Sequence, residues 1–338
     1  MVRLIAQKGG CLMQRTYIDI ESPESLRVRT DTPPQPGPGE VLIDVHYAGV
    51  NRADLLQRVG LYPVPADASP IMGLEVAGTV IANGTGSEGL LPGRRVCALV
   101  AGGGYATHAI ARVDHCLAVP DNISLVEAAA LPEALLTVWH NVVVLGQLRA
   151  DQTALIHGGS SGIGSLGIQM AKLLGAKVLT TAGGPDKCAK VAALGADAVF
   201  DYRAEPLLAQ IEAAGYAGAI DVILDMAGGD FTQLNLDLAA PDGRIVCIGM
   251  MRGLKAEINL FTILQKRLHL TGSTLRGMGL DEKVAAFVAI RQHMLGYIAG
   301  GRIKPVIHAQ FPLKDAMAAH HAMQAGAHVG KLVLNCQV

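Results

Sequence analysis

Glycine and serine gather between two apolar segments in residues 153–175, TALIHGGSSGIGSLGIQMAKLLG. The apolar run before them is typical of a buried parallel strand, and apolar residues at spacings of three and four after them predict a helix. Glycines permit a tight turn close to a phosphate, and a helix N-terminus offers free N–H groups and partial positive charge. This pattern, although weak by itself, predicts a pyrophosphate site formed by Gly159, Ser160, Ser161, Gly162, Ile163 and Gly164.

The choice of nucleotide is expected at the end of the next predicted strand, where an Asp or Glu would bind the ribose of NAD. Residues 180–184 contain no carboxylate, and Lys187 lies just beyond them. Tyr202 and Arg203 follow the third predicted strand. NADPH is therefore favoured, with Gly183, Lys187 and Tyr202 at its adenosine phosphate end. Ordinary solvated charges would explain Lys187 and Arg203 equally well.

These residues belong to an alternation of apolar runs and helical patterns that predicts an α/β fold with a doubly wound parallel sheet. Strands are expected near residues 154–157, 177–181, 198–200, 221–225, 244–248 and 268–273. Ligands of such sheets bind outside the carboxyl ends of the strands. Backbone contacts to a nicotinamide are accordingly expected at Ile248, Gly249, Thr274 and Leu275.

The segment before this alternation is rich in short strands separated by Gly and Pro, which indicates a barrel-like or sandwich-like domain. Residues 125–147 change to helical patterns broken at Pro132, a plausible hinge. A closing helix is expected over 281–300. Further strands at 303–312 and 329–334 are expected to return to the first domain.

Composition excludes several classes of protein. The 338 residues are 50% hydrophobic and 17% charged, with a net charge of −1, which fits large cores and argues against disorder and nucleic-acid binding. No apolar run is long enough to span a membrane. Six dispersed cysteines without a Cys-x-x-Cys pair indicate neither a zinc knot nor a disulfide framework, so a cytoplasmic protein is expected. Residues 1–12 precede a second methionine and are interpreted as a possible N-terminal extension.

Several motifs in a fixed order resemble the medium-chain dehydrogenase/reductase superfamily, particularly its zinc-free quinone oxidoreductase branch of the p53-inducible type. They are AGVNRAD (48–54), GLYP (60–63), GLEVAG (73–78), the turn at 157–164, LGAD (194–197) and GK (330–331). The resemblance implies a GroES-like substrate domain over 13–135 with 303–338, and a Rossmann NADPH-binding domain over 136–302. It also implies an active site in the cleft between them, and a homodimer or homotetramer.

Departures from the zinc-containing relatives indicate the chemistry. Asn51 and Leu74 stand where those relatives carry a cysteine and a histidine, and neither side chain can replace a thiolate or an imidazole as a zinc ligand. We therefore expect no metal. Without a Lewis acid, the acceptor should already be electrophilic, as a quinone or a conjugated enone is. Hydride transfer then needs mainly proximity and orientation.

The same resemblance suggests the residues closest to the chemistry. Tyr62 is expected to orient a quinone oxygen, Asn51 to face nicotinamide or substrate, and Ser161 to contact pyrophosphate or nicotinamide. Thr137 is expected to contact nicotinamide. Each has a structural alternative: a packed loop tyrosine, a turn-stabilising asparagine or a helix-face threonine. An enone or alkenal reductase of the same fold, or a non-catalytic NADPH-binding protein, remains an alternative function.

Overall fold

The computed structural model describes residues 13–337 except 88 and 205, so the possible extension at 1–12 lies outside the described residues. The described chain forms two compact units. One contains the residues up to Glu133 together with those from Leu280 onward, and the other runs from Ala134 to Gly279. In the described part of the chain, no helix is both long and apolar enough to cross a membrane.

The unit from Ala134 to Gly279 is built on a six-stranded sheet in the order β10-β9-β8-β11-β12-β13. All neighbouring strands run parallel. The strands are β8 (Thr153–Ile156), β9 (Lys177–Ala182), β10 (Ala198–Asp201), β11 (Ile220–Asp225), β12 (Ala239–Cys247) and β13 (His269–Gly272). The predicted doubly wound sheet is confirmed, although β12 begins five residues before the expected 244, because Ala239 already pairs with Ile220.

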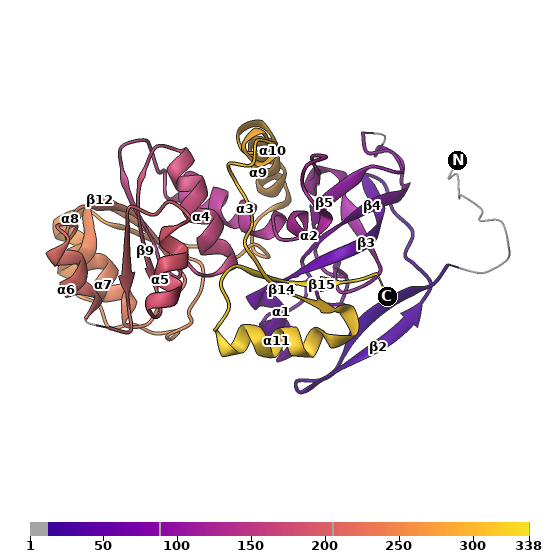
Figure 1. The fold of residues 1–338 in the computed structure, drawn as a ribbon, viewed down its shortest axis with the longest axis horizontal. Coiled ribbons are helices and arrows are strands. Elements are labelled where there is room, and N and C mark those ends of the chain that lie inside the picture. Colours follow the sequence, from indigo (N-terminus) through magenta and orange to yellow (C-terminus); the bar gives the residue numbers. More distant parts are fainter. Residues whose placement is uncertain (1–12, 88, 205, 338) are drawn as a thin grey trace. The chain divides into compact units, whose positions relative to one another are not determined.

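Helices cover both faces of this sheet. Figure 1 shows α4 and α5 on one side of the strands and α6, α7 and α8 on the other. Their bounds are α4 (Gly162–Leu173), α5 (Pro185–Ala192), α6 (Leu207–Ala213), α7 (Phe231–Leu238) and α8 (Leu260–Lys266). Before the sheet, α3 (Pro132–Val138) continues into a π-helix, η2 (Trp139–Leu145). The inner strands β8, β9 and β11 are mostly buried because helices cover the sheet on both sides.

The other unit contains a seven-stranded sheet in the order β14-β15-β3-β4-β5-β7, with β6 paired to β3. Its strands are β3 (Glu40–Val50), β4 (Glu75–Asn83), β5 (Arg95–Leu99), β6 (His108–Arg112), β7 (Cys116–Ala118), β14 (Ile307–Pro312) and β15 (Lys331–Asn335). A separate hairpin joins β1 (Arg15–Ser22) to β2 (Ser25–Asp31). The β-rich domain and the return of the C-terminal strands are thereby confirmed.

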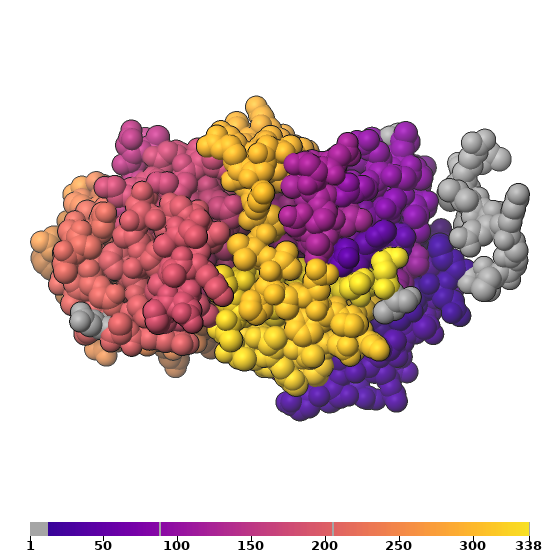
Figure 2. Space-filling model, in the orientation of Figure 1, coloured from indigo at the N-terminus to yellow at the C-terminus, as the bar shows by residue number. Residues whose placement is uncertain are grey.

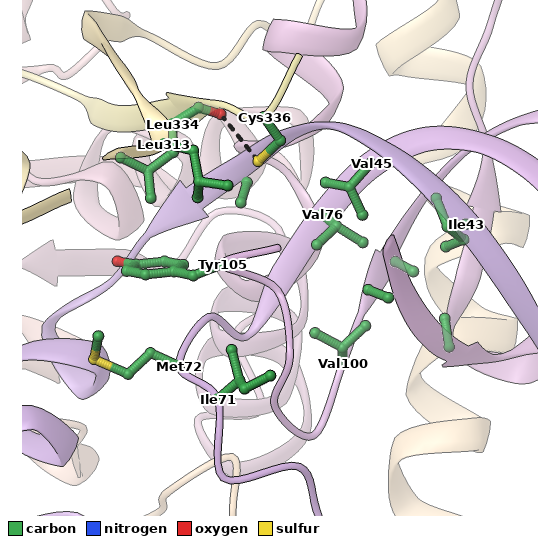
Figure 3. Packing of buried hydrophobic residues seen from close by; sticks show 14 of the residues in the cluster. Ile43, Val45, Ile71, Met72, Val76, Val100, Tyr105, Leu313, Leu334 and Cys336 are labelled. Carbon is green, nitrogen blue, oxygen red and sulfur yellow. Dashed lines mark hydrogen bonds between the residues drawn. The ribbon is translucent and has the colours of Figure 1, made fainter. Parts of the chain in front are cut away.

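The core of this unit draws on both ends of the chain. Figure 3 shows Ile43, Val45 and Val76 from the central strands close to Leu334 and Leu313 from the C-terminal segment. The helix α11 (Ala316–Ala325) packs beside β14 and β15. In Figure 2 these C-terminal segments, in yellow, lie against the indigo N-terminal strands. Burial of this apolar surface accounts for most of the stability of such a core.

The expected boundary at residue 302 differs from the observed division. Residues 280–299 form α9 (Leu280–His293) and α10 (Leu295–Ala299) rather than one helix, and both belong to the unit that contains β7. Phe287 is fully buried and stacks on His115, with ring centroids 5.5 Å apart. The guanidinium of Arg291 donates to the carbonyl of Cys116 at 3.1 Å. These contacts between residues far apart in the sequence hold α9 against the β-rich unit. The local sequence pattern of the helix does not indicate that position.

Candidate functional site

The glycine turn joins β8 to α4 and presents three free donors. Ser161 is the N-cap of α4, and its hydroxyl oxygen accepts from the amide of Gly164 at 2.8 Å. Within the described residues, the amides of Ser160, Gly162 and Ile163 have no acceptor. They lie at the N-terminus of a twelve-residue helix, where the helix dipole adds positive potential. Free amides in such a place form an anion-binding site.

Two glycines of the turn are required by close packing. A Cβ atom on Gly164 would lie 2.3 Å from the carbonyl oxygen of Gly158, and one on Gly159 would lie 2.2 Å from the hydroxyl oxygen of Thr180. Gly158 itself adopts a positive φ of 67°. The backbone therefore folds into a turn too tight for other residues, as the sequence indicates.

The predicted cofactor contacts in this unit lie along one edge of the sheet. Gly183, Ile248 and Thr274 come just after the carboxyl ends of β9, β12 and β13, and parallel strands end at the same edge. Gly249 and Leu275 are the next residues along the chain. The amide of Ile248 donates to the carbonyl of Asp225 at 2.7 Å, which fixes that loop to the end of β11.

A basic cluster surrounds Gly183. A Cβ atom there would lie 2.5 Å from the Tyr202 hydroxyl and 2.9 Å from Nε of Arg203, so both side chains cover this backbone. Burial and the neighbouring charge of Arg203 lower the pKa of Lys187. An anion bound beside Lys187 and Arg203 would offset the repulsion between these two cations. Asp201 lies beside the cluster, and its Oδ1 accepts from the amides of Gly184 and Arg203, each at 2.9 Å.

Thr137 lies in α3 and is buried. Its carbonyl accepts from the side-chain amide of Asn141 at 2.8 Å, and the oxygen of that amide accepts from Ser273 at 2.7 Å. These bonds tie the helix to the end of β13. A contact of Thr137 with nicotinamide stays a prediction, as do the other assigned contacts of this unit.

Asn51 occupies a buried polar cluster in the unit that contains β3. It precedes α1 (Arg52–Arg58), and its side-chain N–H donates to Glu75 Oε1 at 2.9 Å. The ammonium of Lys331 donates to both Asn51 Oδ1 and Glu75. Burial opposes the charge of Lys331, but Glu75 and Glu133 outweigh it and raise its pKa. The side chain of Asn51 is thus held by an ion pair, which leaves one N–H for any contact with substrate.

A second set of hydrogen bonds runs beside this cluster. Asp54 Oδ2 accepts from the amide of Asn51 at 2.8 Å and from the hydroxyl of Tyr105 at 3.0 Å. His320 Nε2 lies 3.1 Å from the same hydroxyl, and since that O–H donates to Asp54, the imidazole is the donor in this contact. Figure 3 shows Tyr105 among the apolar side chains of the core. Desolvation in this environment raises the pKa of Asp54 to about 6.

Tyr62 lies in the irregular segment after α1 and is half-buried. Leu74, at the position where zinc relatives carry histidine, is a buried hydrocarbon side chain. Across residues 13–337 without 88 and 205, no group of three His, Cys, Asp or Glu side chains is placed to hold a metal ion. Independence of metal stays a prediction that depends on these side-chain types.

Two features of the site escaped the sequence analysis. The pairing of Glu75 with Lys331 was not predicted, although each is a lone charge in an otherwise apolar strand, which signals a buried ion pair. The contact of His157 with Asn235 on α7 was not predicted either, and Nε2 lies 2.7 Å from Oδ1. No local pattern indicates that second contact, because 78 residues separate the partners.

Comparisons with known proteins agree with this arrangement. Residues 37–121 match the alcohol dehydrogenase GroES-like domain family, and residues 162–290 match the zinc-binding dehydrogenase family. Quinone oxidoreductase 1 of Escherichia coli is 31% identical over 316 residues, which cover 92% of this chain and 96% of that protein. The crystal structure of E. coli quinone oxidoreductase complexed with NADPH has a TM-score of 0.83 and 30% identity, and the match covers 96% of this chain and 100% of the other.

A much longer protein is also similar. One polypeptide of the phenolphthiocerol/phthiocerol polyketide synthase of Mycobacterium tuberculosis is 30% identical over 331 residues, or 97% of this chain. This chain spans only 15% of the length of that relative. The similarity therefore concerns one segment of a large synthase.

Proposed function

Because the chain belongs to the medium-chain dehydrogenase/reductase superfamily, we propose that it is an NADPH-dependent, zinc-independent quinone reductase. The observation that carries the proposal is the set of free amides at the N-terminus of α4, on the same sheet edge as the basic cluster around Gly183. These two sites would hold the two phosphate-bearing parts of NADPH. The E. coli relative solved with NADPH supports the choice of cofactor.

The residues present fit this cofactor. The amides of Ser160, Gly162 and Ile163 would bind the pyrophosphate, and Lys187 and Arg203 would bind the adenosine 2′-phosphate. No carboxylate follows β9 directly, where one would repel that phosphate. The loops at Ile248 and Thr274 would offer backbone groups to the nicotinamide end.

A quinone fits the side chains that replace the zinc ligands. Asn51 is held by Glu75 and Lys331, and Leu74 has no donor atom, so neither supplies a ligand that zinc prefers. When bound, NADPH supplies a hydride, and a proton from water completes the reduction of quinone to hydroquinone. The role left to this chain is orientation of the acceptor, which we assign to the hydroxyl of Tyr62.

The test follows the loss of NADPH absorbance with 9,10-phenanthrenequinone, 1,2-naphthoquinone and an enone, beside NADH and chelator controls. We expect quinone-dependent oxidation that is slow with NADH and unaffected by chelator. Turnover of the enone alone would reassign the protein to double-bond reduction. Binding of NADPH without turnover of any acceptor would indicate a non-catalytic protein. Loss of activity with chelator would overturn metal independence.

A matched pair of lysines tests the cofactor site. Lys187→Ala should raise the KM for NADPH about tenfold, because it removes one charge-assisted contact to phosphate. The KM for NADH, which lacks that phosphate, should not change. Lys190→Ala removes a lysine from the exposed side of the same helix and should leave both values unchanged.

We also propose that two copies associate through the exposed edge of the six-stranded sheet. Among the described residues β13 pairs only with β12, and all four of its residues are exposed. The neighbouring helix α8 buries none of its residues and exposes Leu260, Phe261 and Leu264. An unpaired edge beside an apolar surface favours pairing with a second copy about a two-fold axis.

A further inference from the structure

A chain of four polar side chains lies beneath the glycine turn and reaches the turn after β11. Its members are Thr181 on β9, His157 after β8, Asn235 on α7 and Asp225 at the end of β11. All four are at least 99% buried. We propose that this buried relay holds the glycine turn in the geometry that binds pyrophosphate, which makes His157 a positioning residue for the dinucleotide. The inference rests on the proposed binding of NADPH.

The contacts are continuous. Nδ1 of His157 lies 3.2 Å from the Thr181 hydroxyl, and Nε2 lies 2.7 Å from Oδ1 of Asn235. The side-chain N–H of Asn235 donates to Asp225 Oδ2 at 3.1 Å. Asp225 Oδ1 accepts from the amides of Ala227 at 2.7 Å and Gly228 at 3.1 Å. The relay therefore ends on an anion held by backbone donors.

The direction of every hydrogen bond follows from Asp225. A carboxylate only accepts, so Asn235 must present its N–H₂ to Asp225 and its oxygen to His157. Nε2 of His157 then carries the proton, and Nδ1 accepts from the Thr181 hydroxyl. This assignment requires a neutral imidazole, and desolvation lowers the pKa of His157 despite the nearby charge of Asp225.

Thr181 connects these hydrogen bonds to the glycine turn. Its hydroxyl oxygen accepts from the amide of Gly158 at 3.1 Å, and its carbonyl accepts from the amide of Gly159 at 2.9 Å. Because the hydroxyl proton is directed to His157, its lone pairs face the turn. Two turn amides are thus held inside the protein, while those of Ser160, Gly162 and Ile163 are left for a ligand.

The experiment compares binding of NADPH with binding of 2′-AMP, which carries the adenosine phosphate but no pyrophosphate. Thr181→Val leaves the Gly158 amide without its acceptor, and His157→Leu removes both the donor to Asn235 and the acceptor for Thr181. Each variant should raise the Kd of NADPH about tenfold and leave the Kd of 2′-AMP unchanged. Thr181→Ser keeps the hydroxyl and should bind NADPH as the unmodified chain does. kcat should change less than KM.

A control variant with a similar loss of stability separates an effect on the position of the turn from an effect on folding. Leu236 is fully buried on α7 next to Asn235, and Leu236→Ala should lower the melting temperature without changing the Kd of NADPH. Equal loss of NADPH and 2′-AMP binding in the relay variants, or loss in Leu236→Ala, would show a merely structural role. Unchanged NADPH binding in Thr181→Val would also overturn the inference.

The outcome for the unmodified chain distinguishes the two proposals. Failure of that chain to bind NADPH overturns the proposed function and this inference together. Binding by that chain with no effect of the relay variants overturns the inference alone. The ¹⁵N spectrum of the imidazole supplies an independent readout, because the assignment requires His157 to carry its proton on Nε2.

Discussion

Asp54 is a buried carboxyl group that has lost most of its hydration. Oδ2 accepts two hydrogen bonds, but Oδ1 has no partner among the described residues. Desolvation is the largest cause of its raised pKa, which increases from 3.8 to about 6, and Glu75 adds repulsion. Ionisation of Asp54 at neutral pH therefore lowers the stability of the folded state.

Asp54→Asn should change how stability depends on pH. The folded state binds the Asp54 proton more tightly than the unfolded chain does, so this residue lowers the free energy of unfolding as pH rises from about 4 to about 6. Relative to the unmodified chain, the variant should gain on the order of 3 kcal/mol between pH 4 and pH 7. Calorimetry at several pH values measures this difference.

His320 and His115 act in the opposite direction, because burial lowers the pKa of each imidazole, to about 3 and about 4. Both are present in the variant and the unmodified chain, so their contributions cancel in the difference. A difference independent of pH would contradict the raised pKa of Asp54.

Gly164 is the glycine of the turn whose added side chain would meet only backbone atoms, those of Gly158 and Gly159. Gly164→Ala would place a Cβ atom 2.3 Å from the carbonyl oxygen of Gly158, and backbone cannot move aside as a flexible side chain can. We expect at least tenfold weaker NADPH binding, because the free amides would shift from the phosphate. Isothermal titration measures the affinity.

Gly296 provides the control for this change. It lies in α10, and a Cβ atom there would meet nothing within 4 Å. Gly296→Ala should bind NADPH normally and be slightly more stable, since alanine has the higher helix propensity. Normal binding in Gly164→Ala would refute the packing argument for the turn.

At the scale of elements, the end of α7 depends on one lysine. The ammonium of Lys266 donates to the carbonyls of Leu236, Asp237 and Ala239 at 3.0, 2.7 and 2.9 Å. These carbonyls lie where α7 passes into β12 and have lost their helical donors. One side chain from α8 therefore supplies hydrogen-bond donors to the carbonyls at the junction of α7 and β12.

Lys266→Met keeps the length of the side chain and removes the three donors. We expect a loss of about 2 kcal/mol, because buried carbonyls would lose a charged donor. Lys190→Met, on an exposed side of α5, should change stability little. Thermal unfolding of both variants measures the effect. Similar melting temperatures for the two would show that solvent replaces Lys266 without cost.

Elements with a strong local pattern were predictable, and those defined by distant contacts were not. Residues 153–175 carry their strand, turn and helix in one stretch, so the glycine turn followed directly from its residues. The side chain of Lys331 meets Glu75 across 256 residues, and Arg291 joins α9 to β7 across 175. Pairings at such separation depend on the whole fold, which no short window contains.

The same reasoning explains Asn51. Its place in the motif AGVNRAD indicated a role near the substrate, but the motif carries no information about Lys331, which approaches from the last strand. The hairpin of β1 and β2 has mostly half-buried or exposed residues, so it lacks a clear alternation of apolar and polar positions. A strand shows alternating apolar and polar residues in the sequence when one of its faces is buried.

At the scale of the whole molecule, β13 leaves one edge of the six-stranded sheet exposed and unpaired among the described residues. Leu260, Phe261 and Leu264 on α8 are 66%, 65% and 73% exposed. Water contact with these three side chains is unfavourable, and a second copy would remove it while also pairing β13. The edge and the helix therefore form the surface that we propose for self-association.

Leu264→Asp should convert the proposed dimer to a monomer, because a charge buried at an apolar interface without a partner costs several kcal/mol. Leu91→Asp is the matched control, since Leu91 is 59% exposed but belongs to the other compact unit. Sedimentation velocity should show a dimer for the unmodified chain and the control, and a monomer for Leu264→Asp. An unmodified chain that sediments as a monomer would rule out the interface. A dimer that persists in Leu264→Asp would place it on a different surface.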